Sequence, residues 1–435
     1  MLKYHIQISI VYVLIMLWSS DNTMAFIGAL TLGELFRMIN SKSLFPIKEA
    51  TSFLLVLQLL FAPFILYRYL DNQSFYAMSI DESTYFSFVI PATLVFNFLL
   101  YTSFNKENKF SPIKKDDRNL QIGIILFIAG FLASYLTPFI PGSLHFVIAL
   151  IKNFPLIGVF YIFFSNYKYR VQIILLFTLM NALSIISGGV FINLFIFAFF
   201  VFSLFAYEYK FSFRIKTLSI IGAIFFAFLI QSFKQEYRDQ IGNNKESDIG
   251  VFMDMSMSNI QEIDLLFSER NIKKFIDRIN QGWILSDILK RVPKIVPIVD
   301  GKYFYRELEG IFLPRFLAPN KAVVGDHSKF LYATGRQLNN QTAMNIGFFG
   351  DGYVNFGFLG GIIFSGLFGL FINLSLKYAY KKAQLFPTLL FWLPLIFFYV
   401  MRAGNEFYII ANWMVKSAVL VALIFYYFRH QLRVK

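Results

Sequence analysis

The chain has 435 residues, a formal net charge of +14 and no cysteine. Hydrophobic residues make up 57% of the sequence and charged residues 15%, whereas ordinary soluble domains hold roughly 45–50% and 25%. This composition excludes a soluble enzyme, a disordered tail and a disulfide-stabilised secreted domain. Because the apolar residues fall in long runs, the sequence predicts an all-α, multi-pass membrane protein.

Taken in chain order, the apolar runs predict about twelve transmembrane helices, since each span needs roughly 20 apolar residues. They lie near residues 4–20, 24–39, 51–69, 84–104, 120–137, 143–165, 171–186, 189–207, 215–233, 348–376, 386–401 and 406–428. We therefore expect three parts: an N-terminal transmembrane bundle (1–233), one large helical outer loop (234–346) and C-terminal transmembrane helices (347–435). A hydrophilic segment as long as 234–346 usually carries function.

Basic residues predict the orientation of these spans. If the N-terminus lies inside, the inner loops hold most Lys and Arg residues outside 234–346, and the short outer loops hold little besides Arg68 and Arg402. Cytoplasmic loops are enriched in Lys and Arg, whereas long loops translocate whatever their charge. We therefore expect both termini in the cytoplasm and the large loop outside. The positive charge then needs no nucleic acid as a partner.

The sequence predicts neither a metal site nor a cofactor. Without cysteine the chain has no disulfide and no thiolate ligand. The histidines His5, His145, His327 and His430 are widely separated, which is unlike the spacing of a histidine-rich metal site.

The 234–346 segment is rich in basic and aromatic residues. It contains sixteen Lys and Arg residues, interspersed with aromatic residues such as Trp283, Tyr303 and Tyr332. Arginine binds phosphate through two parallel hydrogen bonds, and aromatic faces suit sugar rings. A surface of this kind at the membrane boundary favours an anionic, sugar-bearing lipid. The alternative is a solvated loop in which charges pair with each other.

Within this segment, residues 301–321 combine apolar, proline and basic positions. Pro314, Arg315 and Pro319 place a guanidinium in a stiffened apolar stretch, followed by Lys321. This arrangement predicts a phosphate-binding arginine near the membrane surface. The alternative is a surface anchor in which Arg315 extends its charge toward lipid headgroups.

The glycine-rich stretch 347–369 carries two polar residues on one helical face. Asp351 and Asn355 are four residues apart, and a carboxylate there can act as a general base toward a hydroxyl. The alternative is helix packing through the glycines, with Asp351 as a helix cap. His327, which follows Asp326, is another candidate base, although a lone loop histidine is often inert.

Ionisable residues in or at the ends of predicted spans include Lys152, Arg402, Glu406 and Lys416, with Glu34 near an inner end as a further case. Such residues are costly in a membrane and usually face the protein interior. Arg402 and Glu406 are four residues apart, so they can form an ion pair with each other. The two lysines can bind a lipid pyrophosphate or pair with a buried acid or carbonyl. Glu406 is also a candidate general base.

Several stretches of the chain match a known pattern. They are Ser-Gly-Gly at 187–189 between two spans, Pro-Arg-Phe-Leu-Ala-Pro-Asn-Lys at 314–321, Gly-Asp-Gly-Tyr-Val-Asn-Phe-Gly-Phe-Leu-Gly at 350–360, and Arg402 and Lys416 in the late spans. Together they resemble the O-antigen and capsule polymerases, the Wzy family of oligosaccharide repeat unit polymerases. The resemblance covers most of the chain in layout, and residues 290–420 in sequence detail.

This resemblance implies a metal-independent membrane glycosyltransferase. The growing glycan would move from undecaprenyl pyrophosphate to a sugar hydroxyl of an incoming lipid-linked repeat unit. By position, Arg291 and Arg315 are the best matches to pyrophosphate-binding arginines, followed by Arg278 and Arg306. The other residues expected to bind substrate are Lys321, Asn355, Arg402, Lys416 and Lys152.

The resemblance also implies a catalytic base, a location and partners. Asp351, Glu406 or His327 would deprotonate the acceptor hydroxyl. The protein would lie in the bacterial cytoplasmic (inner) membrane and use lipid-linked oligosaccharide as both donor and acceptor, with a chain-length regulator as a further partner.

Two alternative functions remain open at this point. A lipid-linked oligosaccharide flippase or other transporter often shows internal repeats, and the sequence has none that we detect. An O-antigen ligase shares the chemistry but uses a different acceptor, and its expected loop histidine has His327 as the only candidate.

Overall fold

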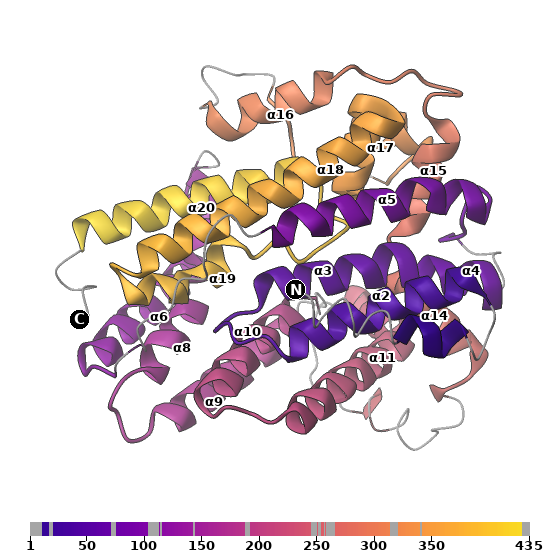
Figure 1. Ribbon diagram of the computed structural model, residues 1–435. Coiled ribbons are helices and arrows are strands. Elements are labelled where there is room, and N and C mark those ends of the chain that lie inside the picture. The colour runs from indigo at the N-terminus through magenta and orange to yellow at the C-terminus, as the bar shows by residue number, and fades with distance from the viewer. Residues whose placement is uncertain are drawn as a thin grey trace.

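The computed structural model describes an all-helical protein (Figure 1). The described residues are 11–16, 21–70, 75–102, 113, 115–141, 144–187, 192–244, 250, 254–255, 257, 266–313, 321–339 and 342–428. Within these ranges no strand is present.

The helices of the first half include most of the predicted N-terminal bundle. They are α2 (Asn22–Ile39), α3 (Ile47–Val56), a π-helical turn (Leu57–Phe61), α4 (Ala62–Tyr69), α5 (Glu82–Tyr101), α6 (Arg118–Leu136), α7 (His145–Ile151), α8 (Phe154–Phe163), α9 (Arg170–Ser187), α10 (Ile192–Glu208) and α11 (Phe213–Asn244).

Among the described residues, the helices of the second half begin with short ones from the 234–346 segment. They are α14 (Glu269–Ile279), α15 (Gly282–Arg291), α16 (Lys302–Phe312), α17 (His327–Thr334), α18 (Gly347–Ala383), a 3₁₀ helix (Pro387–Trp392), α19 (Leu393–Ile396) and α20 (Phe407–Tyr427).

The expected number of twelve spans is not met by the described residues. Seven helices there are long and apolar enough to cross a membrane: Ile47–Tyr69, Glu82–Tyr101, Arg118–Phe139, His145–Phe163, Phe213–Phe233, Gly347–Ala383 and Phe407–Tyr427. They match seven of the predicted segments, and they fit a membrane-spanning protein.

The remaining predicted spans differ for identifiable reasons. Residues 171–186, 189–207 and 386–401 correspond to shorter apolar helices. In the last of them, Pro387 and Pro394 divide the chain into a 3₁₀ helix and the single turn of α19, because proline interrupts helical hydrogen bonding. The segment 24–39 corresponds to α2, which lies outside the set of membrane-length apolar helices. Most of 4–20 lies outside the described residues.

Helices α5 and α18 pack against each other along much of their length. Glycines of α18 allow this approach, since a Cβ added at Gly369 would lie 2.5 Å from the carbonyl oxygen of Phe96. At the periphery, α6 and α11 expose apolar side chains such as Ile125 and Leu218, as expected of helices that face lipid.

The 234–346 segment joins the same core as the spans. Trp283 and Ile288 of α15 and Phe330 of α17 belong to one buried apolar cluster with residues of α5 and α18. In Figure 1, α15 and α17 lie at the end of the molecule where α5 and α18 begin. Helix α11 continues without a break through the expected boundary at residue 233.

A polar contact also ties this segment to the N-terminal part of the chain. Arg336 Nε donates to Asp287 Oδ2 over 2.6 Å, and its Nη1 donates to the carbonyl of Phe75. The hydroxyl of Ser79 donates to the other Asp287 oxygen. These bonds fix α15 in place, so Asp287 stabilises the fold from within that helix.

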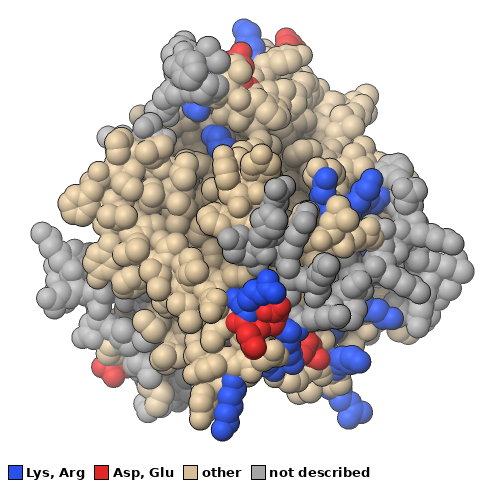
Figure 2. Space-filling view, turned by 90° about the vertical axis from the view of Figure 1, so that its left-hand side faces the viewer, with Lys and Arg blue, Asp and Glu red and all other residues tan. Residues whose placement is uncertain are grey.

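Figure 2 shows the opposite end of the molecule, where Lys and Arg side chains stand on the surface beside a few acidic residues. Helix α20 ends on this side (Figure 1). The last turn of α18 contributes Lys381 and Lys382.

Candidate functional site

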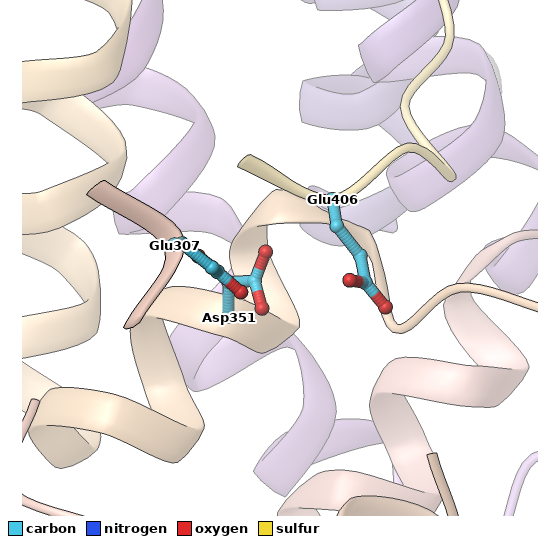
Figure 3. Close-up of side chains that lie close together, drawn as sticks. All are labelled: Glu307, Asp351 and Glu406. Atoms are coloured by element: carbon cyan, nitrogen blue, oxygen red, sulfur yellow. The ribbon is translucent and has the colours of Figure 1, made fainter. Parts of the chain in front are cut away.

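Four charged side chains from distant parts of the sequence meet where α16 and α17 contact the starts of α18 and α20. We call Glu307, Lys329, Asp351 and Glu406 the ionic cluster. One carboxylate oxygen from each of its three acids lies within 4.8 Å of the other two. Figure 3 shows the three side chains close together, from α16, from α18 and from the residue before α20.

Lys329 supplies the positive charge of the ionic cluster. Its Nζ lies 2.5 Å from Glu307 Oε1 and 3.0 Å from Glu406 Oε2, and it also contacts Asp351 Oδ1. The four side chains are between 1% and 5% exposed. With all groups ionised the cluster would carry one positive and three negative charges, a net charge of −2. A net charge of −2 in a buried site is costly in free energy. The ionic cluster therefore favours binding an extra proton.

The start of α18 places Asp351 in the cluster. Gly347 begins this helix with φ +71°, a left-handed conformation that glycine adopts without strain. Asp351 follows one turn later, and its Oδ2 accepts a hydrogen bond from the amide of Phe407 over 2.7 Å. This carboxylate therefore caps the N-terminus of α20, where a negative charge is favourable.

Asn355 aligns α16 with α18. Its Oδ1 accepts from the amide of Phe304 over 3.1 Å, and its Nδ2 donates to the carbonyl of Asp351. The backbone carbonyl of Asn355 also accepts from the amide of Gly301. These contacts hold the first turn of α16, and Glu307 lies one turn further along the same helix. Asn355 thus positions the cluster through the backbone.

Helix α17 presents Lys329 through a capped first turn. The Asp326 side chain accepts from the amides of Ser328 and Lys329, the standard N-cap arrangement. Arg306 Nη2 lies 3.5 Å from the other oxygen of Asp326. The cap and this exposed ion pair orient α17 beside α16.

A small hollow opens next to the ionic cluster. It is lined by Tyr303, Arg306, Glu307, Ala322, Val323, Asp326, Lys329, Glu406 and Tyr408. Two rings and a guanidinium therefore stand beside two of the three acids, while Asp351 lies behind them. This combination brings aromatic rings and a guanidinium to the same hollow as two buried acids.

Burial and neighbouring charges set the proton affinities around the hollow. Burial raises the pKa of the Glu307 carboxyl, and the ammonium of Lys329 opposes this only in part. Burial alone would lower the pKa of Lys329, but Asp351, Glu406 and Glu307 hold it well above its ordinary value. Lys329 is therefore a permanent cation, and Glu307 has an enhanced affinity for a proton.

The three carboxylates also have the geometry of a metal site. Carboxylate oxygens are ligands that suit Mg²⁺ or Ca²⁺. Here the ammonium of Lys329 contacts one oxygen of each acid and supplies the cation within the cluster. We therefore treat this group as an ion-pair cluster.

No protein family, curated protein or solved structure matches the chain.

Two of the three candidate bases meet in the ionic cluster. The structure brings Asp351 and Glu406 together, although they are far apart in the sequence. His327 is the first residue of α17 and does not line the hollow. The predicted ion pair between Arg402 and Glu406 does not form in the part of the chain that the structure describes. Glu406 binds Lys329 and the amide of Ile346 instead.

The predicted substrate-binding arginines are dispersed. Arg306 lines the hollow, whereas Arg291 Nε donates to the carbonyl of Tyr332 over 2.9 Å and thereby supports the end of α17. Arg278 lies exposed in the last turn of α14. Arg315 lies outside the described residues, and Lys321 follows directly after that gap.

The charged residues of the late and middle spans lie apart from the cluster. Arg402 Nη2 donates to Asn193 Oδ1 over 2.6 Å, with its guanidinium above the rings of Phe398 and Tyr399. Lys416 Nζ lies 4.7 Å from the ring centre of Phe146. Lys152 is exposed at the end of α7.

Sequence reasoning missed Glu307 and Lys329 as members of the site. Glu307 stands in an amphipathic stretch with Arg306 and Glu309, and nothing in its spacing separates it from a surface residue. Lys329 is one of sixteen basic residues in its segment. A weak signal was available, since residues 326–329 combine an N-cap aspartate with a lysine on the buried side of the following turn.

Proposed function

We propose that the protein is a membrane glycosyltransferase that polymerises lipid-linked oligosaccharide repeat units of a surface polysaccharide. In this proposal it is an oligosaccharide repeat unit polymerase of the Wzy type. One observation carries it: the buried ionic cluster opens into a hollow with tyrosine rings and an arginine, at the junction of the 234–346 segment with α18 and α20. The resemblance of residues 290–420 to that family supports the same assignment.

For this glycosyl transfer the protein must mainly position the two substrates and stabilise the charges that develop. A sugar hydroxyl attacks the anomeric carbon, and the bond from that carbon to the pyrophosphate oxygen breaks. A carboxylate of the cluster takes the hydroxyl proton, and basic side chains stabilise the negative charge on the departing pyrophosphate. Arg306 at the hollow and Arg315 nearby in sequence are the residues we assign to that second role.

The proposal includes a location. The basic residues at the end shown in Figure 2 support a cytoplasmic position for that end, because cytoplasmic loops are enriched in Lys and Arg. The ionic cluster then lies at the outer face of a bacterial cytoplasmic membrane, where flipped lipid-linked glycans are accessible. Both termini would be cytoplasmic, with the remaining predicted spans completing the bundle.

The test is the surface polysaccharide ladder of a strain lacking this gene, with and without a plasmid carrying it. A polymerase predicts that the deletion strain displays a single repeat unit and that the plasmid restores the ladder. Unattached polymer in the deletion strain would instead indicate a ligase. Loss of all surface glycan would indicate a flippase. A normal ladder without the gene would refute all three assignments.

A transporter is the second candidate, and the ionic cluster itself favours it. Asp351 is buried in the first segment of α18, before the break at Gly357, and buried acids in membrane proteins often relay protons. Proton-coupled transport predicts that dissipating the proton gradient stops glycan export in the wild-type strain. Polymer formation from purified lipid-linked repeat units, with no gradient present, would exclude transport as the explanation.

A further inference from the structure

The three acids of the ionic cluster differ in how their oxygens are used. Asp351 Oδ1 is in ion-pair contact with Lys329 but has no hydrogen-bond partner among the described residues, and its Oδ2 accepts from the amide of Phe407. Both oxygens of Glu406 are engaged, by Lys329 and by the amide of Ile346. These two carboxylates hold the starts of α18 and α20 in place.

Glu307 is different. Its Oε1 accepts from Lys329 over 2.5 Å, whereas its Oε2 has no hydrogen-bond partner among the described residues. The side chain is only 3% exposed, and the residue lines the hollow. A buried oxygen without a partner costs about 1–3 kcal/mol, so this atom favours a donor that enters from the hollow.

We propose that the hollow is the acceptor subsite and that Glu307 Oε2 is the atom that takes the proton from the acceptor hydroxyl. This inference rests on the proposed function and assigns a residue that the sequence did not single out. The ligand class is a neutral sugar hydroxyl, because Tyr303 and Tyr408 line the same hollow as Glu307 and aromatic faces suit sugar rings. As the hydroxyl oxygen bonds to the anomeric carbon, its proton moves to Oε2 and the pyrophosphate leaves with the bonding electrons.

Lys329 has a positioning role in this arrangement. Its ammonium contacts Glu307, Asp351 and Glu406 at once, which fixes the orientation of the Glu307 carboxylate. It also limits the charge that develops when the carboxylate is ionised. Glu307 is then held with one oxygen bound to Lys329 and the other buried without a hydrogen-bond partner among the described residues.

The first experiment uses membranes that contain the full-length chain and lipid-linked glycan extracted from the deletion strain. Glu307→Gln keeps the acceptor for Lys329 and removes the basic oxygen, and we expect polymer formation to fall by about 100-fold or more. Glu309→Gln is the matched control, because Glu309 is exposed on the same helix. We expect Glu309→Gln to form as much polymer as the wild type when equal amounts of protein are compared. Wild-type polymer from Glu307→Gln would overturn the inference.

A second pair of variants covers the case in which Glu307→Gln fails to fold. Val323 and Val324 are 57% and 56% exposed, but only Val323 lines the hollow. We expect Val323→Trp to obstruct the hollow and reduce polymer, and Val324→Trp to leave it unchanged. Equal polymer from both tryptophan variants would contradict an acceptor subsite here. If the wild-type chain itself makes no polymer from the extract, the proposed function fails, which is a separate result.

Discussion

The two ends of the bundle bury charged side chains in different ways. In the second half of α18, Lys377 Nζ donates to the carbonyl of Thr102, and in α11 Lys216 Nζ donates to the carbonyl of Ile39. Asn373 donates to the same Thr102 carbonyl and accepts from Lys48 over 2.6 Å. We call Lys48, Lys216, Asn373 and Lys377 the capping network. Along the sequence of α18, Asn373 and Lys377 follow the break in that helix at Gly357, whereas Asp351 of the ionic cluster precedes it.

The difference shows which polar group is a candidate for chemistry. The capping network satisfies the last carbonyls of α2 and α5, which have no partner inside their own helices, and cations are favourable there. The ionic cluster has more acids than bases and leaves Glu307 Oε2 without a partner. At one end, buried polar side chains therefore satisfy helix-end carbonyls. At the other end, the ionic cluster leaves the buried oxygen Glu307 Oε2 without a hydrogen-bond partner among the described residues.

Removing the ammonium from the ionic cluster should have the largest effect on stability. Lys329→Met leaves three buried acids without a cation, and we expect a loss of about 3–5 kcal/mol in the free energy of unfolding. Denaturant unfolding of the purified chain in detergent measures this loss. Lys302→Met is the control, because Lys302 is exposed at the start of α16. Adding Glu307→Gln to Lys329→Met should recover part of the stability, and no recovery would contradict an excess of negative charge.

The capping network should tolerate substitution better. Asn373→Leu removes two donors from helix-end carbonyls and the acceptor for Lys48, so we expect a loss of about 1–3 kcal/mol. The same unfolding experiment measures it, with Leu374→Ala as the control at an exposed neighbouring position. A larger loss than that of Lys329→Met would reverse the ranking of the two ends.

The pH dependence of stability separates Glu307 from the rest of the cluster. Burial raises the pKa of Glu307 above the ordinary 4.5, with Lys329, Glu406 and Arg306 acting on it and Asp351 beside it. A raised pKa means that the folded state binds the proton more tightly. The resulting stabilisation is complete below pH 4.5 and is lost as pH rises through the raised value. We therefore expect Glu307→Gln to gain in melting temperature relative to the wild type as pH rises through that window. Parallel melting curves would show that Glu307 keeps an ordinary pKa.

Exposed ion pairs at the cluster end should matter least. Arg68 Nε lies 2.7 Å from Glu82 Oε2, but the arginine side chain is 45% exposed. Solvent screens such a pair, so Arg68→Ala should change the free energy of unfolding by less than about 1 kcal/mol. A loss comparable with that of Asn373→Leu would show that exposure is a poor guide to the energetics here.

The sequence predicted the helical membrane class and part of the site. Asp351 and Glu406 could be singled out because acids at the ends of apolar segments are costly, and this cost is visible in composition alone. Glu307 and Lys329 could not, because their burial depends on how α16 and α17 dock onto α18 and α20. That docking depends on backbone contacts such as those of Asn355, which have no sequence signature.

The loop helices show the same limit at smaller scale. Apolar residues three or four apart over residues 271–283 predict one helix, whereas α14 ends at Ile279 and α15 begins at Gly282. The break occurs because Asn280 is extended and its Oδ1 accepts from the amide of Gly282 over 2.8 Å. The predicted span over residues 386–401 was wrong in the same way. The segment is apolar, but Pro387 and Pro394 divide it into two short helices.

Polymer made per molecule of protein by Glu307→Gln and Asn373→Leu tests the contrast between the two ends most directly. Both variants are assayed in the same membranes, with lipid-linked glycan extracted from the deletion strain, and are normalised to the amount of folded chain. The account predicts that Glu307→Gln retains the fold and makes almost no polymer, whereas Asn373→Leu is less stable but makes wild-type polymer per molecule. Full polymer from Glu307→Gln, or an equal loss in both variants, would contradict it.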